Sequence, residues 1–190
     1  MTHKFDVQNK NKLDNPKRRE MLPIDKVLAE IGLREDDILA DIGCGIGYFS
    51  IPAAQLIASK GIVYALDVKN EMIEEVEKRA KENDLDNIRT VVTDEYDLKL
   101  EDKSVSYAFI CTVLHEIKDR IKFINETKRI LNNSGKIAVV EWIKEDGDWG
   151  PPVSHRVSSV EIEEELKEIG FKEISYEKIS QYFYIIMGTL

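Results

Sequence analysis

The stretch Asp41-Ile42-Gly43-Cys44-Gly45-Ile46-Gly47 follows the apolar run Ile38-Leu39-Ala40, and these residues decide the fold. Glycines at this spacing suit a strand that turns sharply into a helix, because side chains would block the turn and keep a ligand away from the backbone. Asp67 ends a second apolar run, 20 residues beyond Gly47. A carboxylate at the end of the neighbouring strand is placed to accept hydrogen bonds from ribose hydroxyls. The stretch therefore predicts a nucleoside-binding turn in an α/β protein.

The spacing of the glycines also bears on which nucleoside is bound. The dinucleotide fingerprint is G-x-G-x-x-G, but here the third glycine comes one position early, at Gly47, and Tyr48 stands where that pattern has glycine. Asp41 would repel a pyrophosphate, whereas it suits a ligand that carries an amino group and a sulfonium. Two alternatives are a glycine-rich turn without a ligand and an NAD-dependent oxidoreductase.

This pattern resembles motif I of the class I S-adenosylmethionine (SAM) dependent methyltransferases. The resemblance implies that Asp41 holds the methionine end of SAM and that Gly43, Gly45 and Gly47 form the turn against it. Further positions match the same family's cofactor site; they are Asp67, Val68, Met72, Asp94 and Cys111. Alternatives stay open for some of them: Asp67 as the cap of a helix that begins near Asn70, Asp94 as an ordinary loop carboxylate, and Val68 and Met72 as plain core.

The segment Cys111-Thr112-Val113-Leu114-His115-Glu116-Ile117 resembles motif IV of the branch that includes quinone-biosynthesis methyltransferases. The resemblance implies in-line transfer of the methyl group of SAM to a small-molecule acceptor, with S-adenosylhomocysteine (SAH) as product. His115 is the candidate base, because its ordinary pKa lies near neutrality; the alternative is a histidine that makes local hydrogen bonds at a helix start. A SAM-binding sensor or accessory protein without catalysis is the alternative function.

Along the chain, apolar runs of strand length alternate with segments of helical period, which predicts a parallel sheet with helices on both faces. Expected strands are Ile38 to Ile42, Ile62 to Asp67, Ile88 to Val92, Val105 to Cys111 and Lys136 to Trp142. Expected helices include 24 to 31, Arg120 to Leu131 before a turn at Asn132 to Gly135, and Ser159 to Ile169. The runs Phe171 to Tyr176 and Tyr182 to Met187 are too close for a crossover helix and should form an antiparallel hairpin. The fold predicted is α/β, a Rossmann-like doubly wound sheet of seven strands that is mostly parallel and ends in this hairpin.

Length and composition favour one enzyme domain. The 190 residues predict a single domain over 1–190, with 1–20 as an N-terminal arm. A net charge of −9 makes nucleic acid an unlikely partner. The first 20 residues contain no apolar core of the signal-peptide kind. The sequence also contains no apolar run of 18 residues, which a membrane span would need, so we expect a cytoplasmic protein. The oligomeric state stays open.

Cysteine and histidine usage argues against metal chemistry. Cys44 and Cys111 are expected to be free thiols. His3, His115 and His155 show no ligand spacing, so no metal site is predicted.

Two segments are expected to shape the acceptor side. The loop from Lys144 to Ser158 follows the fifth strand, and its aromatic and proline content suits a lid. The N-terminal arm could fold over the cofactor as a flap, or be a solvated tail. Arg18, Arg19 and Arg156 hint at an anionic acceptor.

Overall fold

The computed structural model describes residues 13–190. Its helices are α1 (Pro16–Met21), α2 (Ile24–Ile31), α3 (Ser50–Ile57), α4 (Asn70–Glu82), α5 (Arg120–Ile130) and α6 (Ser159–Ile169), with short 3₁₀ turns η2 (Ala58–Lys60), η3 (Leu114–Glu116) and η4 (Val153–His155). Its strands are β1 (Ile38–Ile42), β2 (Ile62–Asp67), β3 (Ile88–Val92), β4 (Val105–Cys111), β5 (Leu131–Trp142), β6 (Lys172–Lys178) and β7 (Phe183–Thr189).

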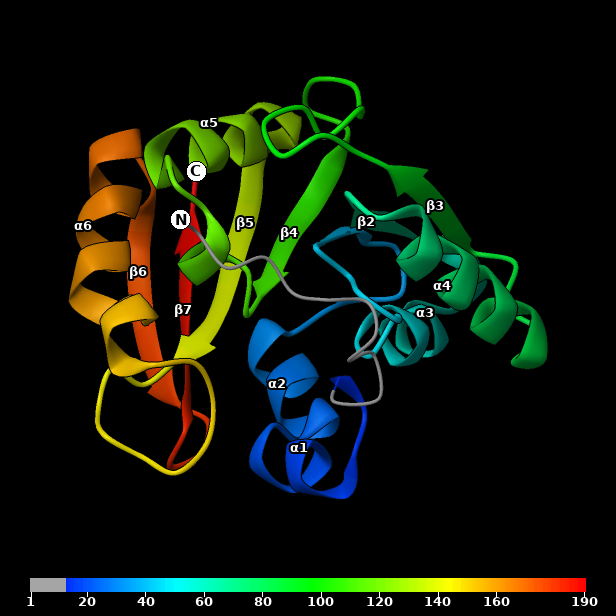
Figure 1. Cartoon of the computed structure of the whole chain (residues 1–190). Helices are drawn as coiled ribbons and strands as arrows, with labels where there is room; N and C mark the ends of the chain where they lie inside the picture. Colours follow the sequence, from blue (N-terminus) through cyan, green and yellow to red (C-terminus); the bar gives the residue numbers. More distant parts are fainter. Residues whose placement is uncertain (1–12) are drawn as a thin grey trace.

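Within the described residues, seven strands form one sheet in the order β3-β2-β1-β4-β5-β7-β6 (Figure 1). The pairs of β1 with β2 and β4, of β2 with β3, and of β4 with β5 are parallel, while β7 runs antiparallel to β5 and β6. The predicted fold class, including the antiparallel hairpin, is confirmed. The order reverses at β1, whose two neighbours are β2 and β4, and ligands of open α/β sheets bind in the crevice at such a switch point.

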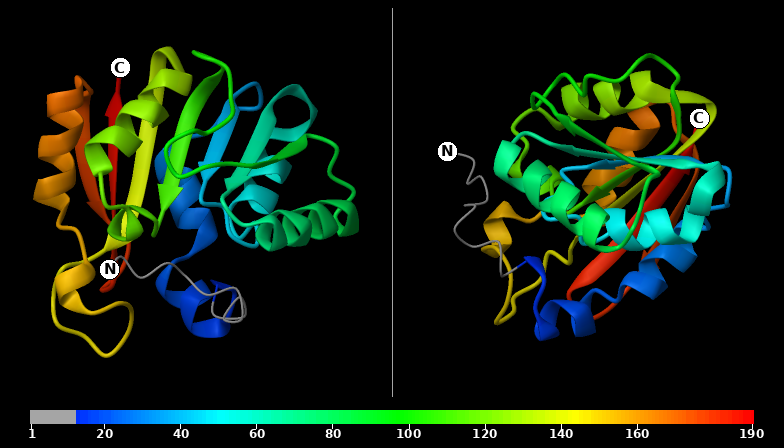
Figure 2. Two further views of the ribbon diagram at one scale, coloured as in Figure 1. Left: turned by 45° about the horizontal axis from the view of Figure 1, so that its top comes forward. Right: turned by 90° about the vertical axis from the view of Figure 1, so that its right-hand side faces the viewer.

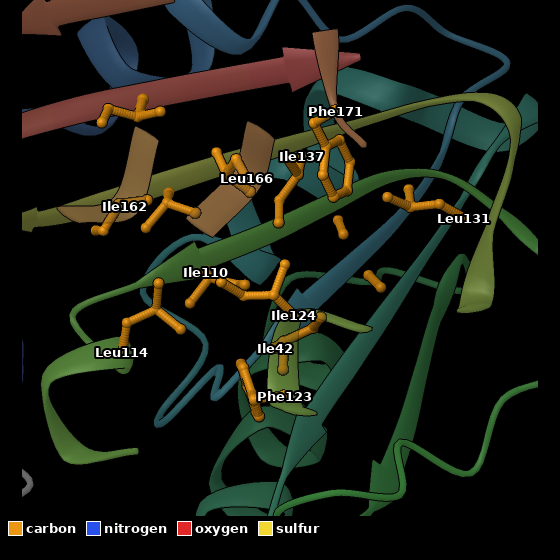
Figure 3. Close-up of a cluster of buried hydrophobic side chains, with 14 of the residues drawn as sticks. Ile42, Ile110, Leu114, Phe123, Ile124, Leu131, Ile137, Ile162, Leu166 and Phe171 are labelled. Carbon is orange, nitrogen blue, oxygen red and sulfur yellow. The ribbon is translucent and has the colours of Figure 1, made fainter. Parts of the chain in front are cut away.

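Alternate residues of each strand point to opposite faces, and helices cover both (Figure 2). Ala40 and Ile42 of β1 lie in the cluster that α5 and α6 complete. Figure 3 shows Ile42 in this cluster with Phe123, Ile124 and Leu166. On the other face, Leu39 of β1 and Phe109 of β4 pack with buried residues of α2 and α3. Burial on both faces explains why the central strands appear in the sequence as nearly continuous apolar runs.

The predicted start of the fifth strand was wrong, and the bounds of the two hairpin strands differ from the predicted ones by one or more residues at each end. Strand β5 begins at Leu131 rather than Lys136, and α5 ends at Ile130. The pairing between β4 and β5 nevertheless shifts register at this point: Val105 pairs with Leu131, but Tyr107, two residues further along β4, pairs with Lys136, five residues further along β5. The expected turn residues, 132 to 135, therefore bulge out of the strand, and the Ser134 backbone N–H donates to Asn132 Oδ1 at 3.0 Å.

No helix in the described part of the chain is long and apolar enough to cross a membrane.

Candidate functional site

A cavity of about 1120 Å³ lies beside the carboxyl ends of the parallel strands. Its walls come from the glycine turn after β1, the ends of β2, β3 and β4, the loop after β5, and the N-terminal helix α1. In Figure 1 the arrowheads of β4 and β5 point toward this side of the molecule. The volume exceeds the roughly 300–1,000 Å³ of an ordinary small-ligand site, so two small molecules can lie side by side.

The glycine turn is held by the strand beside it. The backbone N–H groups of Gly43 and Cys44 both donate to the Leu66 carbonyl, at 2.7 and 2.9 Å. Gly43 has a φ of +72°, and a Cβ added there would lie 2.4 Å from Val113 Cγ2. Glycine is therefore required at this position by both backbone conformation and space.

Asp67 fastens the same turn through its side chain. Its Oδ2 accepts from the Gly45 N–H at 3.0 Å, and its Oδ1 accepts from the Lys69 N–H at 2.9 Å. The N-cap residue of α4 is Lys69, so Asp67 is not the cap of that helix. Burial raises the pKa of Asp67 and the backbone donors lower it, with a net rise. The carboxylate lines the cavity at the end of β2, as the sequence predicts.

Asp41 is a buried carboxyl group of the site. Its side chain lies at the end of β1 with 2% of the residue exposed, and Ser50 Oγ donates to Oδ2 at 2.5 Å. Burial raises the pKa of Asp41 to about 7, against the lowering effect of the Ser50 hydrogen bond, and the Asp67 carboxylate adds to the rise. A cation that entered the cavity beside Asp41 would favour its ionised form.

Of the other predicted cofactor residues, Val68, Met72, Asp94 and Cys111 line the cavity, whereas Gly45 and Gly47 belong to the turn but are not among the residues that line it. Met72 is buried and Val68 is 43% exposed. The Asp94 side chain is 74% exposed and forms an ion pair with Lys99 Nζ at 2.9 Å. Burial raises the pKa of the Cys111 thiol to about 12, so it is a neutral part of the wall. Cys44 and Cys111 are both buried free thiols.

His115 lies beside a carboxylate that the sequence analysis missed. Its Nδ1 is 2.9 Å from Glu141 Oε2 and 3.1 Å from Oε1, and its backbone N–H donates to Glu141 Oε1 at 3.3 Å. Glu141, in β5, is fully buried and also accepts from the Trp142 N–H at 3.2 Å. Burial lowers the pKa of His115, but the Glu141 carboxylate outweighs it, so the pKa lies above its ordinary value. A glutamate inside the apolar run of β5 was the signal in the sequence, since glutamate is almost never fully buried without a partner.

The loop after β5 lines the cavity with Trp149, Pro151, Pro152 and His155. Trp149 packs edge to face on Trp142, with ring centroids 4.9 Å apart. Arg156 braces this loop: its guanidinium donates to the carbonyls of Ile143, Glu145, Trp149 and Pro151, each at 2.9 Å. The guanidinium of Arg156 is therefore occupied by backbone carbonyls of this loop and is not positioned to bind an acceptor.

The described part of the N-terminal arm lies against the site. Leu13, Asn15 and Arg18 line the cavity, and Asp14 forms ion pairs with Arg19 at 2.6 Å and with Arg79 of α4 at 3.3 Å. The rest of the predicted arm, residues 1–12, lies outside the described residues. Residues 13–190 hold no cluster of three or more histidine, cysteine or acidic side chains that could bind a metal.

Comparison with known proteins relates these features to a family. A model of the methyltransferase domain matches residues 40–139. The demethylmenaquinone methyltransferase of Staphylococcus aureus (strain MRSA252) is 27% identical over 116 residues, which cover 61% of this chain and 47% of that protein. The 27-O-demethylrifamycin SV methyltransferase of Amycolatopsis mediterranei (strain S699) is 28% identical over 172 residues, covering 83% of this chain and 62% of that protein. The chain thus spans about half to three fifths of the length of these curated relatives.

Among solved structures, a SAM dependent methyltransferase from Aquifex aeolicus is similar over nearly the whole chain. It has a TM-score of 0.92 and 30% sequence identity, and the match covers 98% of this chain and 99% of that one. Together with the matched domain model, this similarity shows that the chain belongs to the SAM-dependent methyltransferases.

Proposed function

We propose that this protein transfers the methyl group of SAM to a small-molecule acceptor. The observation that carries the proposal is one cavity with two chemically different halves. The glycine turn, Asp41 and Asp67 line one half, and the His115–Glu141 pair and the aromatic loop line the other. A protein that only bound SAM would have no use for the second half.

The residues of the first half fit SAM. Each Asp67 oxygen accepts one backbone hydrogen bond, which leaves capacity for ribose hydroxyls. Asp41 would pair with the amino group of the methionine portion, and Asp94 would accept from the adenine amino group, once displaced from Lys99. Val68, Met72 and Cys111 would contact the nucleoside. When bound, SAM supplies an electrophilic methyl group on a sulfonium sulfur.

The residues of the second half would align the acceptor and take its proton. Glu141 fixes the His115 ring through Nδ1, so His115 Nε2 would accept a proton from a hydroxyl or an acidic carbon. Trp149 and the prolines beside it would exclude water. Alignment of the reacting groups supplies about 7–11 kcal/mol of barrier reduction where it is good.

The cavity and the charge support a small acceptor. The net charge of −9 disfavours nucleic acid, and the relatives are named for demethylmenaquinone and 27-O-demethylrifamycin SV. We further propose that residues 1–190 form one domain, that the arm covers bound SAM, and that the protein acts in the cytoplasm.

Isothermal titration with SAM, SAH and NAD tests the cofactor half. We expect micromolar binding of SAM and SAH, no binding of NAD, and at least about tenfold weaker SAH binding in Asp67→Asn, because hydrogen bonds to a charged group are lost. Asp86→Asn, which changes an exposed carboxyl away from the cavity, is the matched control. Absence of SAH binding in the wild type, or equal binding by a folded Asp67→Asn protein, would contradict the proposal.

A further inference from the structure

The three arginines that hint at an anionic ligand have three different environments. Arg156 is saturated with backbone carbonyls of its own loop. Arg19 is an exposed residue whose guanidinium pairs with Asp14 at 2.6 Å. Arg18 is 93% buried, with 7% of its surface exposed, and it lines the cavity. Of these three arginines, Arg18 is the one that is buried and lines the cavity.

The guanidinium of Arg18 has no polar partner in the described part of the chain. Its Nε is buried without a hydrogen-bond acceptor, and no carboxylate of residues 13–190 forms an ion pair with it. Its contact is with the Tyr48 ring, whose centroid lies 5.2 Å from Cζ. An arginine cannot escape burial by losing its proton, so an unpaired buried guanidinium is costly unless a ligand supplies the missing anion.

The backbone around Arg18 holds it in this place. Asn15 caps α1 by accepting from the Arg18 N–H at 3.0 Å, and the fully buried Leu22 ends the helix. The Tyr48 hydroxyl donates to the Leu22 carbonyl at 2.9 Å. Tyr48 directly follows the glycine turn, so the turn and Arg18 are joined by one side chain.

Arg18 also lies near the point where the two halves of the cavity meet. The pKa of the Cys111 thiol, raised mainly by burial, is lowered by the charge of Arg18 and raised by the charge of Asp41. Both charges therefore act on the same thiol at the end of β4. A ligand that lies over Cys111 would be within the influence of both charges.

We propose that Arg18 binds a carboxylate of a ligand in this cavity. The planar guanidinium matches a carboxylate with two parallel hydrogen bonds. This inference rests on the proposed function, and two sources supply the group: the α-carboxylate of the cofactor, which is attached to the same carbon as the ammonium assigned to Asp41, or an anionic acceptor in the second half. Arg18 is then a specificity residue for this ligand.

The test compares Arg18→Gln with Arg19→Gln, which removes the same charge one residue away at an exposed position. Each variant and the wild type are titrated with SAH and with decarboxylated SAH, which keeps the amine and lacks the carboxylate. If the group is that of the cofactor, Arg18→Gln weakens SAH binding about ten- to hundredfold and leaves binding of decarboxylated SAH unchanged. Arg19→Gln changes neither, and Arg18→Lys is intermediate because it keeps the charge without the fork.

The acceptor source is tested on protein saturated with SAH, with benzoate as the carboxylate probe. Benzoate binding that is present in the wild type and in Arg19→Gln and lost in Arg18→Gln, with SAH affinity unchanged, assigns Arg18 to the acceptor. Equal weakening of SAH and decarboxylated SAH, or no effect of Arg18→Gln on either SAH or benzoate, overturns the inference. Failure of the wild type to bind SAH would instead refute the cofactor site, and melting curves of each variant establish that it is folded.

Discussion

Asp41 gives the unliganded protein a characteristic response to pH. Because burial raises its pKa to about 7 from an ordinary 3.8, the folded chain holds this proton over a pH range in which the unfolded chain has released it. The free energy of unfolding should therefore fall as the pH rises from about 4 to 7 and level off above, by up to about 4 kcal/mol for a difference of about 3 in pKa.

Urea unfolding of the wild type and Asp41→Asn between pH 4 and 8 measures this contribution. The stability difference between them should change with pH over that window, while Asp86→Asn should run parallel to the wild type. A constant difference between wild type and Asp41→Asn would show that Asp41 is already ionised at the low end of the range.

Glu141 sets the protonation of His115. Since the carboxylate raises the pKa of His115 and holds its Nδ1, Glu141→Gln should move the imidazole titration to lower pH. The chemical shifts of the His115 ring, followed by NMR from pH 5 to 9, measure this shift without any need for an acceptor. Glu177→Gln, a substitution at an exposed position of β6, should leave the pKa of the His115 imidazole unchanged.

In a methyl-transfer assay the same substitution should reduce kcat and move the rise of the rate with pH to lower values, because a less basic imidazole is deprotonated earlier. His115→Gln, which removes the proposed base, should cost about 10²- to 10⁴-fold in kcat. An unchanged pH profile in Glu141→Gln would show that Glu141 does not act through His115.

Some residues of the candidate site could be predicted from the sequence and others could not. Asp41, Asp67 and His115 stand in or beside motifs whose spacing fixes their place at strand ends, and all three line one cavity. Glu141 and Arg18 depend on contacts across the fold, with residues 26 and 30 positions away along the chain. No local pattern encodes such pairings, although a charged residue inside an apolar run was a usable sign.

Among the structural elements, the conformation of the loop after β5 depends on the side chain of Arg156. Replacement of Arg156 by Met removes four hydrogen bonds to loop carbonyls. We expect the loop to open about ten- to hundredfold more often, since a charge-assisted hydrogen bond contributes about 1.5–3 kcal/mol. Chymotrypsin cleavage at Trp149, followed by mass spectrometry, should accelerate accordingly.

Lys144→Met is the matched control for this change. Lys144 lies on the same loop but forms only a half-exposed ion pair with Glu161, so its loss should leave the cleavage rate close to that of the wild type. Equal cleavage of Arg156→Met and wild type would mean that the aromatic contacts of Trp149 hold the loop instead.

Element boundaries followed from the sequence where burial is continuous. The bounds of β1, β2 and β4 match the apolar runs, because both faces of these strands are covered. The bounds of β3 match as well, although this edge strand is only partly buried. The start of β5 did not follow, since Leu131 belongs to the strand only through its pairing with Val105 on a distant segment. The hairpin strands differ at their ends for a similar reason: β6 is an exposed edge strand whose limits depend on pairing with β7.

For the whole molecule, ligand binding at the strand ends should stabilise the fold. SAH at 100 times its Kd adds about 2.7 kcal/mol to the free energy of unfolding if it binds only the folded chain. For a chain of this length this corresponds to a rise in Tm of roughly 5–11 °C. Differential scanning calorimetry measures the rise, with NAD at the same concentration as control; an equal response to NAD would indicate nonspecific stabilisation.

The overall topology was predictable because sequence order restricts it so strongly. Parallel strands joined by helices must cross over with one hand, and the closely spaced final runs leave an antiparallel hairpin as the simple solution. What the sequence could not supply was the packing of the arm, since a short polar helix such as α1 carries little apolar signal and is placed by Leu22, Tyr48 and Asp14.

The hydrogen bonds of Arg156 fix the backbone of the loop after β5 independently of the side chains that this loop carries. The four acceptors are main-chain carbonyls, and every amino acid possesses one. Side chains between Lys144 and His155 can therefore be exchanged while the arginine continues to set the path of the backbone, except at Gly150, where φ is +98° and an added Cβ would lie 2.7 Å from the Trp142 ring. A laboratory library that varies these positions and keeps Arg156 would sample new acceptors on a constant frame, so the same scaffold could acquire a different substrate without being refolded around it.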